Sequence, residues 1–177
     1  MPPGTRFRIG LAWRSTIYRD DAGVAQSKLS RSMPLAALAP FGQLRGVELV
    51  SLQVAHGSEE TGRVAGLDLT DLTAHIDDMA DTAALISRLD LVVCIDTSVA
   101  HVAACMGAPL IVLLSSDPDW RWRAGDIDSP WYPAARVFRQ SVRNDWRGPV
   151  QAACGAARAQ ATAQKSPSLL ARWFGRR

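Results

Sequence analysis

Apolar runs and amphipathic stretches alternate along the chain. Residues Leu91–Ile95 and Leu110–Leu114 are short, almost wholly apolar runs of the length of buried strands. Between them the pattern changes to a helix over Ser98–Met106, and Gly107 is its expected stop. A strand, a helix and a strand in this order predict a βαβ unit. Such units build parallel sheets with helices on both faces, so we expect an α/β fold.

The same alternation extends toward the N-terminus. Residues 6–13 (RFRIGLAW) and 47–53 (VELVSLQ) read as two further strands. They are separated by a long polar loop over residues 14–32 and a predicted helix over residues 34–44. We expect Ser32 to cap that helix, because a serine hydroxyl can accept a hydrogen bond from a free N–H of the first turn.

The remaining segments are predicted with less regular patterns. Residues 66–79 read as a short strand and a loop, and Asp81 is expected to begin a short helix whose apolar side carries Ala84, Leu85 and Leu89. A short edge strand is predicted over Arg136–Arg139, and a last helix is expected to start near Asp145 or Trp146.

Composition indicates one globular domain. The chain has 177 residues, of which 47% are hydrophobic and 21% are charged. We assign residues 1–150 to this domain and residues 151–177 to an alanine-rich helix end followed by a basic, flexible tail. Two interpretations of the tail stay open: a solvated terminus, which we favour, or a basic amphipathic peptide that contacts a membrane surface or a partner. The net charge of +3 owes much to the tail arginines, so it argues against nucleic acid as a partner.

Several functional classes find no support in the sequence. The three cysteines lack metal-ligand spacing or a disulfide framework, which is typical of a protein from a reducing cytoplasm, and the three histidines are not spaced as a metal site (Cys94, Cys105, Cys154; His56, His75, His101). No run is long enough to span a membrane, and the first residues lack a signal-peptide core. Glycine-rich dinucleotide and P-loop motifs are absent, as is a Gly-x-Ser-x-Gly elbow.

Polar residues gather where the strand Leu91–Ile95 ends. Ligands of parallel sheets bind outside the carboxyl ends of the strands, and a helix N-terminus there offers free N–H groups and partial positive charge. Thr97 and Ser98 add hydroxyl groups, and His101 lies one helical turn further on. This combination suits a phosphate. Asp96 would repel a diphosphate, so we expect it to accept helix N–H groups or to bind a neutral hydroxyl such as that of a sugar.

A purely structural interpretation accounts for the same residues. Asp96 or Thr97 can be an ordinary helix N-cap, and His101 can be a partly buried histidine with its hydrogen bonds satisfied. The stretch by itself leaves both interpretations open.

Over residues 8–150 the chain resembles the heptosyltransferase-like glycosyltransferases of family 9. The resemblance is carried by DLVVCIDTSVAHVAACMGAPLIVLL (residues 90–114), where a strand ends in Asp-Thr, His follows shortly after, and Gly-x-Pro precedes the next strand. Residues 9–13, 32–41 and 78–93 resemble further blocks of the same domain. Residues 117–140 look most like the branch of the family that is fused to tetratricopeptide repeats.

The resemblance implies one half of a two-domain GT-B enzyme. It matches the C-terminal, Rossmann-like domain, which in the family holds a nucleotide-sugar donor as substrate and needs no cofactor or metal. The acceptor-binding N-terminal domain and the repeats have no counterpart in the chain, so we expect an excised, split or truncated product whose partner is the missing region. The implied reaction is inverting glycosyl transfer to a glycan or a protein. The alternative is a non-catalytic nucleotide-binding or interaction module that keeps the fold.

The resemblance also implies roles for individual residues. His101 and Arg31 are the implied catalytic residues, since positive charge or hydrogen-bond donors must stabilise the departing diphosphate. Donor and phosphate contacts are expected from five residues (Asp96, Thr97, Ser98, Lys28, Arg14). The long loop departs from the shorter one of the relatives, and its Arg31-Ser32 pair is the part that matches them.

Two further pairs are expected near the donor. Met79 and Gln53 are implied to line the nucleoside pocket. Trp120 and Arg121 follow a strand end, so they are candidates for loop contacts with the donor. An alternative role for the second pair is to pin a loop or a domain interface.

Overall fold

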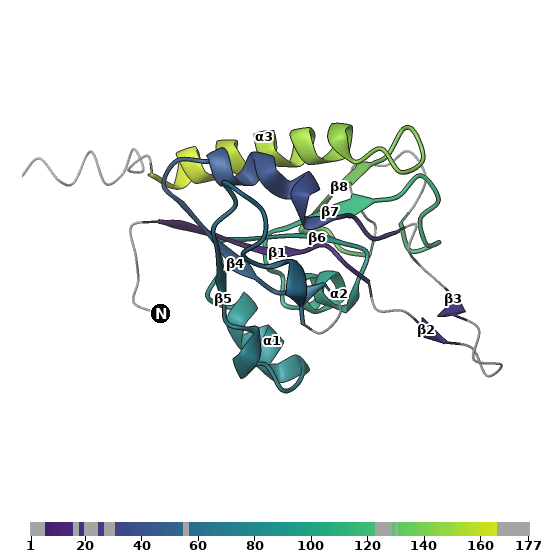
Figure 1. The fold of residues 1–177 in the computed structure, drawn as a ribbon, viewed down its shortest axis with the longest axis horizontal. Coiled ribbons are helices and arrows are strands. Elements are labelled where there is room, and N and C mark those ends of the chain that lie inside the picture. The colour runs from purple at the N-terminus through teal and green to yellow at the C-terminus, as the bar shows by residue number, and fades with distance from the viewer. Residues whose placement is uncertain are drawn as a thin grey trace, which may run out of the picture.

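The computed structural model describes residues 6–15, 18–19, 25–26, 31–54, 57–122, 129 and 131–165. A six-stranded sheet forms its centre, with the spatial order β5-β4-β1-β6-β7-β8 (Figure 1). All five pairings between neighbouring strands are parallel, as expected. The strands are β1 (Phe7–Ala12), β4 (Val47–Ser51), β5 (Leu69–Asp71), β6 (Leu91–Ile95), β7 (Leu110–Leu114) and β8 (Ala135–Arg139).

The strand order places a switch point between β1 and β6. Numbered along the chain, the six strands lie in the order 3-2-1-4-5-6, which is the order of dinucleotide-binding Rossmann folds. The chain winds one way from β1 to β5 and then returns to β6, so the loops that leave β1 and β6 diverge. Ligand crevices in such sheets open at this point, outside the carboxyl ends of the strands.

Helices cover both faces of the sheet. On one face lie α3 (Arg147–Lys165) and the 3₁₀ helix η2 (Leu35–Gln43); on the other lie α1 (Met79–Ile86) and α2 (Ser98–Cys105) (Figure 1). Side chains of β6 alternate between the two cores: those of Leu91, Val93 and Ile95 pack on the α3 side, and those of Val92 and Cys94 pack on the α2 side. Because both faces of β6 are buried, its sequence reads as a continuous apolar run.

The segment over residues 34–44 differs from the predicted helix. It is a nine-residue 3₁₀ helix, and the residue at its N-cap position is Pro34, with no side-chain cap. Ser32 is therefore not the cap that we expected; its hydroxyl accepts a hydrogen bond from the N–H of Ser15 at 3.0 Å. Pro40 lies inside the helix and removes a donor, which works against a regular α-helix.

Helix α1 begins two residues earlier than predicted. Asp78, not Asp81, is the N-cap: its carboxylate accepts hydrogen bonds from the N–H groups of Ala80 and Asp81. The side chain of Asp81 accepts from the N–H of Asp77, which lies outside the helix. Ala84 is exposed rather than part of the apolar side, and the buried residues of α1 are Thr82 and Ile86. Leu85 and Leu89 pack against the core on the α2 side, as predicted, and lie on the same face as Thr82 and Ile86.

The βαβ unit has the predicted boundaries. Both strands span the expected residues, and α2 starts at Ser98 as expected. Met106 is its C-cap, and Gly107 has a φ of +68°, a left-handed conformation that glycine adopts without steric cost.

Helix α3 follows Asp145 and Trp146, as predicted, and runs unbroken across the boundary that we placed at residue 150. Four of its small residues after that point are buried against the sheet and η2 (Ala153, Cys154, Ala157, Ala161). The described part of the alanine-rich segment therefore belongs to the folded domain. Residues 166–177, on which the predictions about the tail depend, lie outside the described residues. Among the helices that the structure describes, none combines the length and hydropathy needed to cross a membrane.

Candidate functional site

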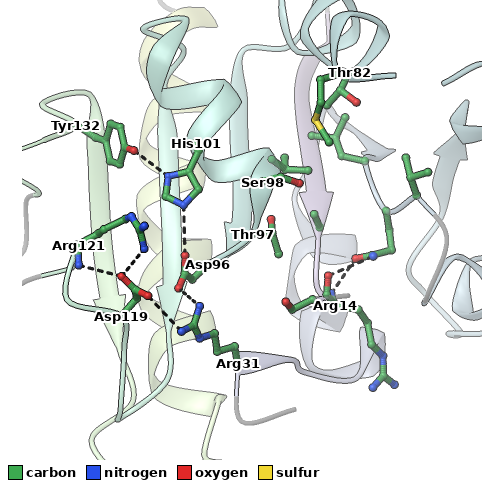
Figure 2. Close-up of a pocket in the computed structure, with 17 residues that line it drawn as sticks. Arg14, Arg31, Thr82, Asp96, Thr97, Ser98, His101, Asp119, Arg121 and Tyr132 are labelled. Atoms are coloured by element: carbon green, nitrogen blue, oxygen red, sulfur yellow. Dashed lines mark hydrogen bonds and ion pairs between the residues drawn. The ribbon is translucent and has the colours of Figure 1, made fainter. Parts of the chain in front are cut away.

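A cleft of about 690 Å³ opens at the carboxyl ends of β1, β4 and β6, beside the first turn of α2. This is the switch point of the sheet, and Figure 2 shows the side chains that converge on it. Nine of the eleven predicted site residues line the cleft (Arg14, Arg31, Gln53, Met79, Asp96, Thr97, Ser98, His101, Arg121). Lys28 lies outside the described residues, and Trp120 is not part of the lining.

Arg31 bridges two carboxylates at one end of the cleft. Its guanidinium donates to Asp96 at 2.7 Å and lies 3.5 Å from a carboxylate oxygen of Asp119 (Figure 2). Asp96 follows directly after β6 and its side chain is 6% exposed. The arginine therefore compensates a buried negative charge, which would otherwise carry a large desolvation cost. We expected Asp96 to accept helix N–H groups or to bind a neutral hydroxyl; among the described residues its carboxylate pairs with Arg31, and binding of a hydroxyl stays a prediction.

Asp119 pairs with a second arginine, Arg121, in addition to Arg31. Its carboxylate accepts from the guanidinium of Arg121 at 2.7 Å and from the N–H of the same residue at 3.2 Å. Partial burial acts to raise the pKa of Asp119, but the hydrogen bonds from Arg121 and the charges of Arg121 and Arg31 hold it below its usual value. The carboxylate is consequently ionised at neutral pH and fixes both arginines.

His101 lies on the first turns of α2 and points back toward Asp96. Its Nε2 is 3.7 Å from an oxygen of that carboxylate, and its Nδ1 shares a hydrogen bond of 2.8 Å with the hydroxyl of Tyr132. The imidazole stacks against the ring of Trp122, with centroids 6.0 Å apart and 23° between the planes. Both ring nitrogens and one ring face thus have neighbours, while the side chain remains one-third exposed to the cleft.

The start of α2 is open to the cleft. Thr97 occupies the N-cap position, but its side chain makes no capping hydrogen bond, so the simple N-cap interpretation does not describe it. Its hydroxyl oxygen is buried and has no hydrogen-bond partner among the described residues. Ser98 is exposed and lines the cleft. An unpartnered buried hydroxyl beside free helix N–H groups fits an absent polar ligand.

Arg14 is the second arginine of the cleft, and its charge is matched by Glu60. The guanidinium of Arg14 hydrogen-bonds to that carboxylate and points away from Asp96 (Figure 2). The other oxygen of Glu60 accepts from the N–H of Leu35 at 2.8 Å, which ties the start of η2 to the same carboxylate. A phosphate contact by Arg14 stays a prediction.

Gln53 is buried and holds the end of β1 in place. Its side-chain oxygen accepts from the N–H groups of Trp13 and Arg14 at 2.9 and 2.8 Å, and its amide nitrogen donates to the carbonyl of Arg14. These bonds satisfy backbone N–H and carbonyl groups of the two residues that follow β1, Trp13 and Arg14. The role that we expected, a contact with a nucleoside, stays a prediction for Gln53.

The end of the cleft beside α1 is apolar. Met79 lies on the first turn of α1 and is 54% exposed, and Val54, which also lines the cleft, is 41% exposed. Leu52 and Val99 complete the wall. The cleft therefore has an apolar end near α1, the open start of α2 in the middle, and the charged groups of Arg31, Asp96 and Asp119 at the other end.

Arg121 lines the cleft and Trp120 does not. The guanidinium of Arg121 donates to Asp119, which also lines the cleft. Trp120 is exposed and makes an edge contact with Trp131. The Arg121 guanidinium carbon lies 4.8 Å from the centre of the Trp120 ring. We left two roles open for Trp120: a contact with the donor, or pinning of a loop or a domain interface. Its described contacts are with Trp131 and Arg121, which belong to these loops, and a donor contact stays a prediction.

Sequence reasoning did not single out three site residues: Asp119, Tyr132 and Glu60. Each acts through a partner far away in sequence, such as Tyr132 with His101 or Glu60 with Arg14. The only available signal was the position of Asp119 after the strand β7, which brings it to the same sheet edge as Asp96. Burial, and to a smaller extent the Asp96 charge, raises the pKa of the Cys94 thiol, so this cysteine is not a nucleophile.

The cleft suits an elongated ligand with chemically different parts. A flat, weakly polar group fits the apolar end, and an anionic group fits the helix N-terminus. Hydroxyl groups fit the carboxylates of Asp96 and Asp119. No group of three or more His, Cys, Asp or Glu side chains that could hold a metal ion occurs within the described part of the chain.

The chain matches a family model and is similar to a known bacterial protein. The family model for glycosyltransferase family 9 (heptosyltransferase) matches residues 36–147, which is more than half of the chain. Protein FlbA of Caulobacter vibrioides is 27% identical over 150 residues, which cover 78% of this chain and 23% of FlbA.

Solved structures of similar fold come from the same family. A family 9 glycosyltransferase of Veillonella parvula superimposes with a TM-score of 0.63 at 15% identity, over 90% of this chain and 47% of that one. The ADP-heptose lipopolysaccharide heptosyltransferase II of Escherichia coli gives 0.60 at 20% identity, over 92% and 48%. The E. coli heptosyltransferase WaaC with ADP gives 0.52 at 16% identity, over 94% and 46%.

The chain thus spans about half the length of these structures, and its parallel sheet with helices on both faces corresponds to roughly one domain of their GT-B-like fold. On the match of the family model to residues 36–147, this chain belongs to glycosyltransferase family 9.

Proposed function

We propose that this chain binds a nucleoside-diphosphate sugar and forms the donor half of an inverting, metal-independent glycosyltransferase. One observation carries the proposal: at the switch point of the sheet, a single cleft combines an apolar end, an open helix N-terminus with the unpartnered hydroxyl of Thr97, and a charged end around Asp96. Membership of glycosyltransferase family 9 supports the same reading.

The ligand has one favourable orientation in this cleft. Its base lies against Met79 and Val54, where apolar surface is otherwise exposed. The diphosphate lies at the start of α2, where free N–H groups and the hydroxyls of Thr97 and Ser98 donate to it. The sugar then reaches Asp96, whose carboxylate accepts from sugar hydroxyls.

The chemistry needs stabilisation of the departing diphosphate. Negative charge grows on the leaving phosphate as the bond from the sugar carbon breaks, and cations or N–H donors at that place lower the barrier. Arg31 and His101 are the groups of the cleft that can supply this, and we assign them that role. Arg31 exchanges at least part of its pairing with Asp96 for the phosphate when the donor binds.

In this proposal the acceptor is bound by a domain other than the one that this chain forms. The acceptor is a glycan or a protein, held by an acceptor-binding domain or a repeat region that the donor half meets across the cleft. By resemblance we favour the branch with tetratricopeptide repeats, and we place the reaction in the cytoplasm. A nucleotide sugar is a substrate here, and neither a cofactor nor nucleic acid takes part.

The test is a thermal-shift screen of the chain against ADP, UDP, GDP and CMP, followed by isothermal titration with any nucleotide that shifts the melting temperature. Binding to the native state raises the apparent stability with ligand concentration. We expect a shift with at least one diphosphate and its loss in His101→Ala. Folded protein that responds to none of the four contradicts the donor-site proposal.

One observation favours a second function, a non-catalytic binding or interaction module. Among the described residues, each arginine of the cleft already faces a carboxylate: Arg14 with Glu60, Arg31 with Asp96 and Asp119, and Arg121 with Asp119. Such pairing reduces the pull on a diphosphate. Release of free sugar from a nucleotide sugar, or its transfer by the chain together with an acceptor-binding domain, contradicts this second function.

A further inference from the structure

Two backbone hydrogen bonds hold Tyr132 beside the cleft. Its N–H donates to the carbonyl of Ser129 at 3.2 Å, and its carbonyl accepts from the N–H of Ala135, the first residue of β8, at 2.9 Å. Ser129 itself is 4% exposed. These two bonds position the backbone from which the hydroxyl of Tyr132 reaches Nδ1 of His101.

Aromatic rings pack around the imidazole of His101, in addition to the contacts at its nitrogens. Trp122 stacks on it, and the ring of Tyr132 lies at a centroid distance of 5.6 Å with a tilt of 55°. Trp122 is 2% exposed, and its backbone N–H donates to the carbonyl of Asp119 at 2.9 Å. Two aromatic rings thus pack around the histidine side chain, and the hydroxyl of Tyr132 contacts Nδ1.

The neighbours of the two nitrogens favour one tautomer. Nε2 is 3.7 Å from a carboxylate oxygen of Asp96, and a negative charge at that distance favours a hydrogen on Nε2. In the neutral ring Nδ1 is then an acceptor, and the hydroxyl of Tyr132 donates to it at 2.8 Å. The gap of 3.7 Å is too long for a direct hydrogen bond to Asp96 and leaves the Nε2–H for a ligand oxygen.

We propose that Tyr132 is a positioning residue that acts through His101, holding its imidazole in the tautomer that directs an Nε2–H donor at the ligand. The tautomer follows from the contacts of His101 with Asp96 and Tyr132, and the role toward a ligand rests on the proposed nucleotide-sugar site. Trp122 packs on the ring, the carboxylate of Asp96 favours the hydrogen on Nε2, and the hydroxyl of Tyr132 holds that tautomer by donating to Nδ1. This division predicts that removal of the single oxygen of Tyr132 matters although its ring remains.

The tautomer is tested first, without ligand, by ¹⁵N–¹H NMR of the histidine rings in wild type and Tyr132→Phe, at a pH at which the rings are neutral. Signals are assigned with single His→Gln variants. We expect a pyrrole-type Nε2 and a hydrogen-bonded Nδ1 for His101, and loss of the Nδ1 shift in Y132F. The exposed His75 is the internal control and stays unchanged. A hydrogen on Nδ1, or identical His101 signals in the two proteins, overturns the proposal.

The second test is a double-mutant cycle in nucleoside-diphosphate binding, using the nucleotide that wild type binds best. Y132F is expected to weaken binding by about two- to tenfold, the usual range for one hydrogen bond. In the H101A background the same change is expected to have no further effect, because Tyr132 then has nothing to position. An equal loss in both backgrounds means that Tyr132 acts by packing or touches the ligand itself, and it overturns the proposal.

The two tests separate this inference from the proposed function. If wild type binds none of the nucleotides while the tautomer result holds, the proposed function and the ligand part of the inference fail together, and the Tyr132–His101 arrangement stands as a device for some other ligand. If nucleotides bind and the cycle is additive, the proposed function survives and the inference fails. Ser87→Ala, which removes an exposed hydroxyl at the far end of α1, controls for nonspecific loss of binding.

Discussion

Two clusters built around an arginine flank the cleft, and they differ in what they bind. In the Arg14 cluster (Arg14, Gln53, Glu60), side chains hydrogen-bond to backbone groups of Trp13, Arg14 and Leu35 and join separate segments. In the Arg31 cluster (Arg31, Asp96, Asp119, His101), Arg31 and Asp96 contact only side chains among the described residues. The first cluster fastens the chain, whereas the pair at the centre of the second can be exchanged for a ligand.

The difference between the two clusters shows how a structural arginine can be told apart from one that is available to a ligand. Arg14 and Arg31 have the same side-chain chemistry and come from the same long loop, and only the resemblance gave Arg31 a catalytic role and Arg14 a donor contact. Their carboxylate partners separate them: Glu60 also holds the N–H of Leu35, while Asp96 faces the open start of α2. A partner that is itself tied to the backbone indicates a structural arginine.

The largest expected effect compares the two arginines in nucleotide binding. We expect Arg31→Met to lower affinity for a nucleoside diphosphate by about 10- to 100-fold, since a charge-assisted hydrogen bond contributes about 1.5–3 kcal/mol and two carboxylates lose their counter-charge. Arg14→Met is expected to change affinity by less than about threefold. Isothermal titration of both variants measures this. Equal losses contradict the distinction between the clusters.

The next effect tests the fastening role through stability. Glu60→Ala removes hydrogen bonds to Arg14 and to the N–H of Leu35, so we expect the free energy of unfolding to fall by about 2 kcal/mol. Urea unfolding measures it. Glu48→Ala is the matched control: it removes an ion pair with Arg8 of 3.5 Å and is expected to cost less than about 1 kcal/mol. Similar costs for the two variants argue against a special role of Glu60.

A smaller effect concerns Gly57, which precedes the 3₁₀ helix η3 (Ser58–Glu60) that carries Glu60. Gly57 has a φ of +97°, and a Cβ there would lie 2.5 Å from Cγ of Arg14. Gly57→Ala is expected to cost about 1–2 kcal/mol, from the left-handed backbone and from displacement of Arg14. Gly62→Ala, at a φ of +78° in open space, carries the backbone cost alone and is expected to be milder in the same unfolding assay.

The smallest effect is the pH dependence of the Arg31 cluster. The folded-state pKa of Asp119 is lowered, so its carboxylate stabilises the fold above about pH 4, and this contribution is lost as the pH falls through the folded-state pKa. Asp119→Asn removes it. Unfolding in urea at pH 3 and pH 7 is expected to show a smaller difference for the variant than for wild type, and an unchanged difference contradicts the ionic role.

The fold was predictable where one local pattern decides the structure. The strands β6 and β7 lie between two apolar layers, so their boundaries appear directly as apolar runs. Prediction was wrong where two similar signals compete: Asp78 and Asp81 are both good caps, and only the extended backbone of Asp78 selects it. Pro40, in a segment that otherwise reads as an α-helix, marked the place where a 3₁₀ helix forms.

The positions of the candidate site residues could be predicted from the sequence, but the side chains that they contact could not. Topology brings residues after parallel strands to one edge, so Asp96, Thr97 and Gln53 could be placed near one another from the sequence. Which groups they contact depends on side chains that the sequence does not relate. Tyr132 follows His101 by 31 residues, and nothing in the pattern around it indicates the hydrogen bond that they share.

The pairing of charges in the cleft also bears on how quickly a ligand arrives. Among the described residues that line or support it, three arginines face three carboxylates (Arg14, Arg31, Arg121; Glu60, Asp96, Asp119). Such a surface exerts little electrostatic steering on an approaching anion, because its field largely cancels beyond a Debye length of about 8–10 Å. Encounter rates with a nucleotide sugar would then vary little with ionic strength, and selectivity among donors would reside in how slowly the matching one departs.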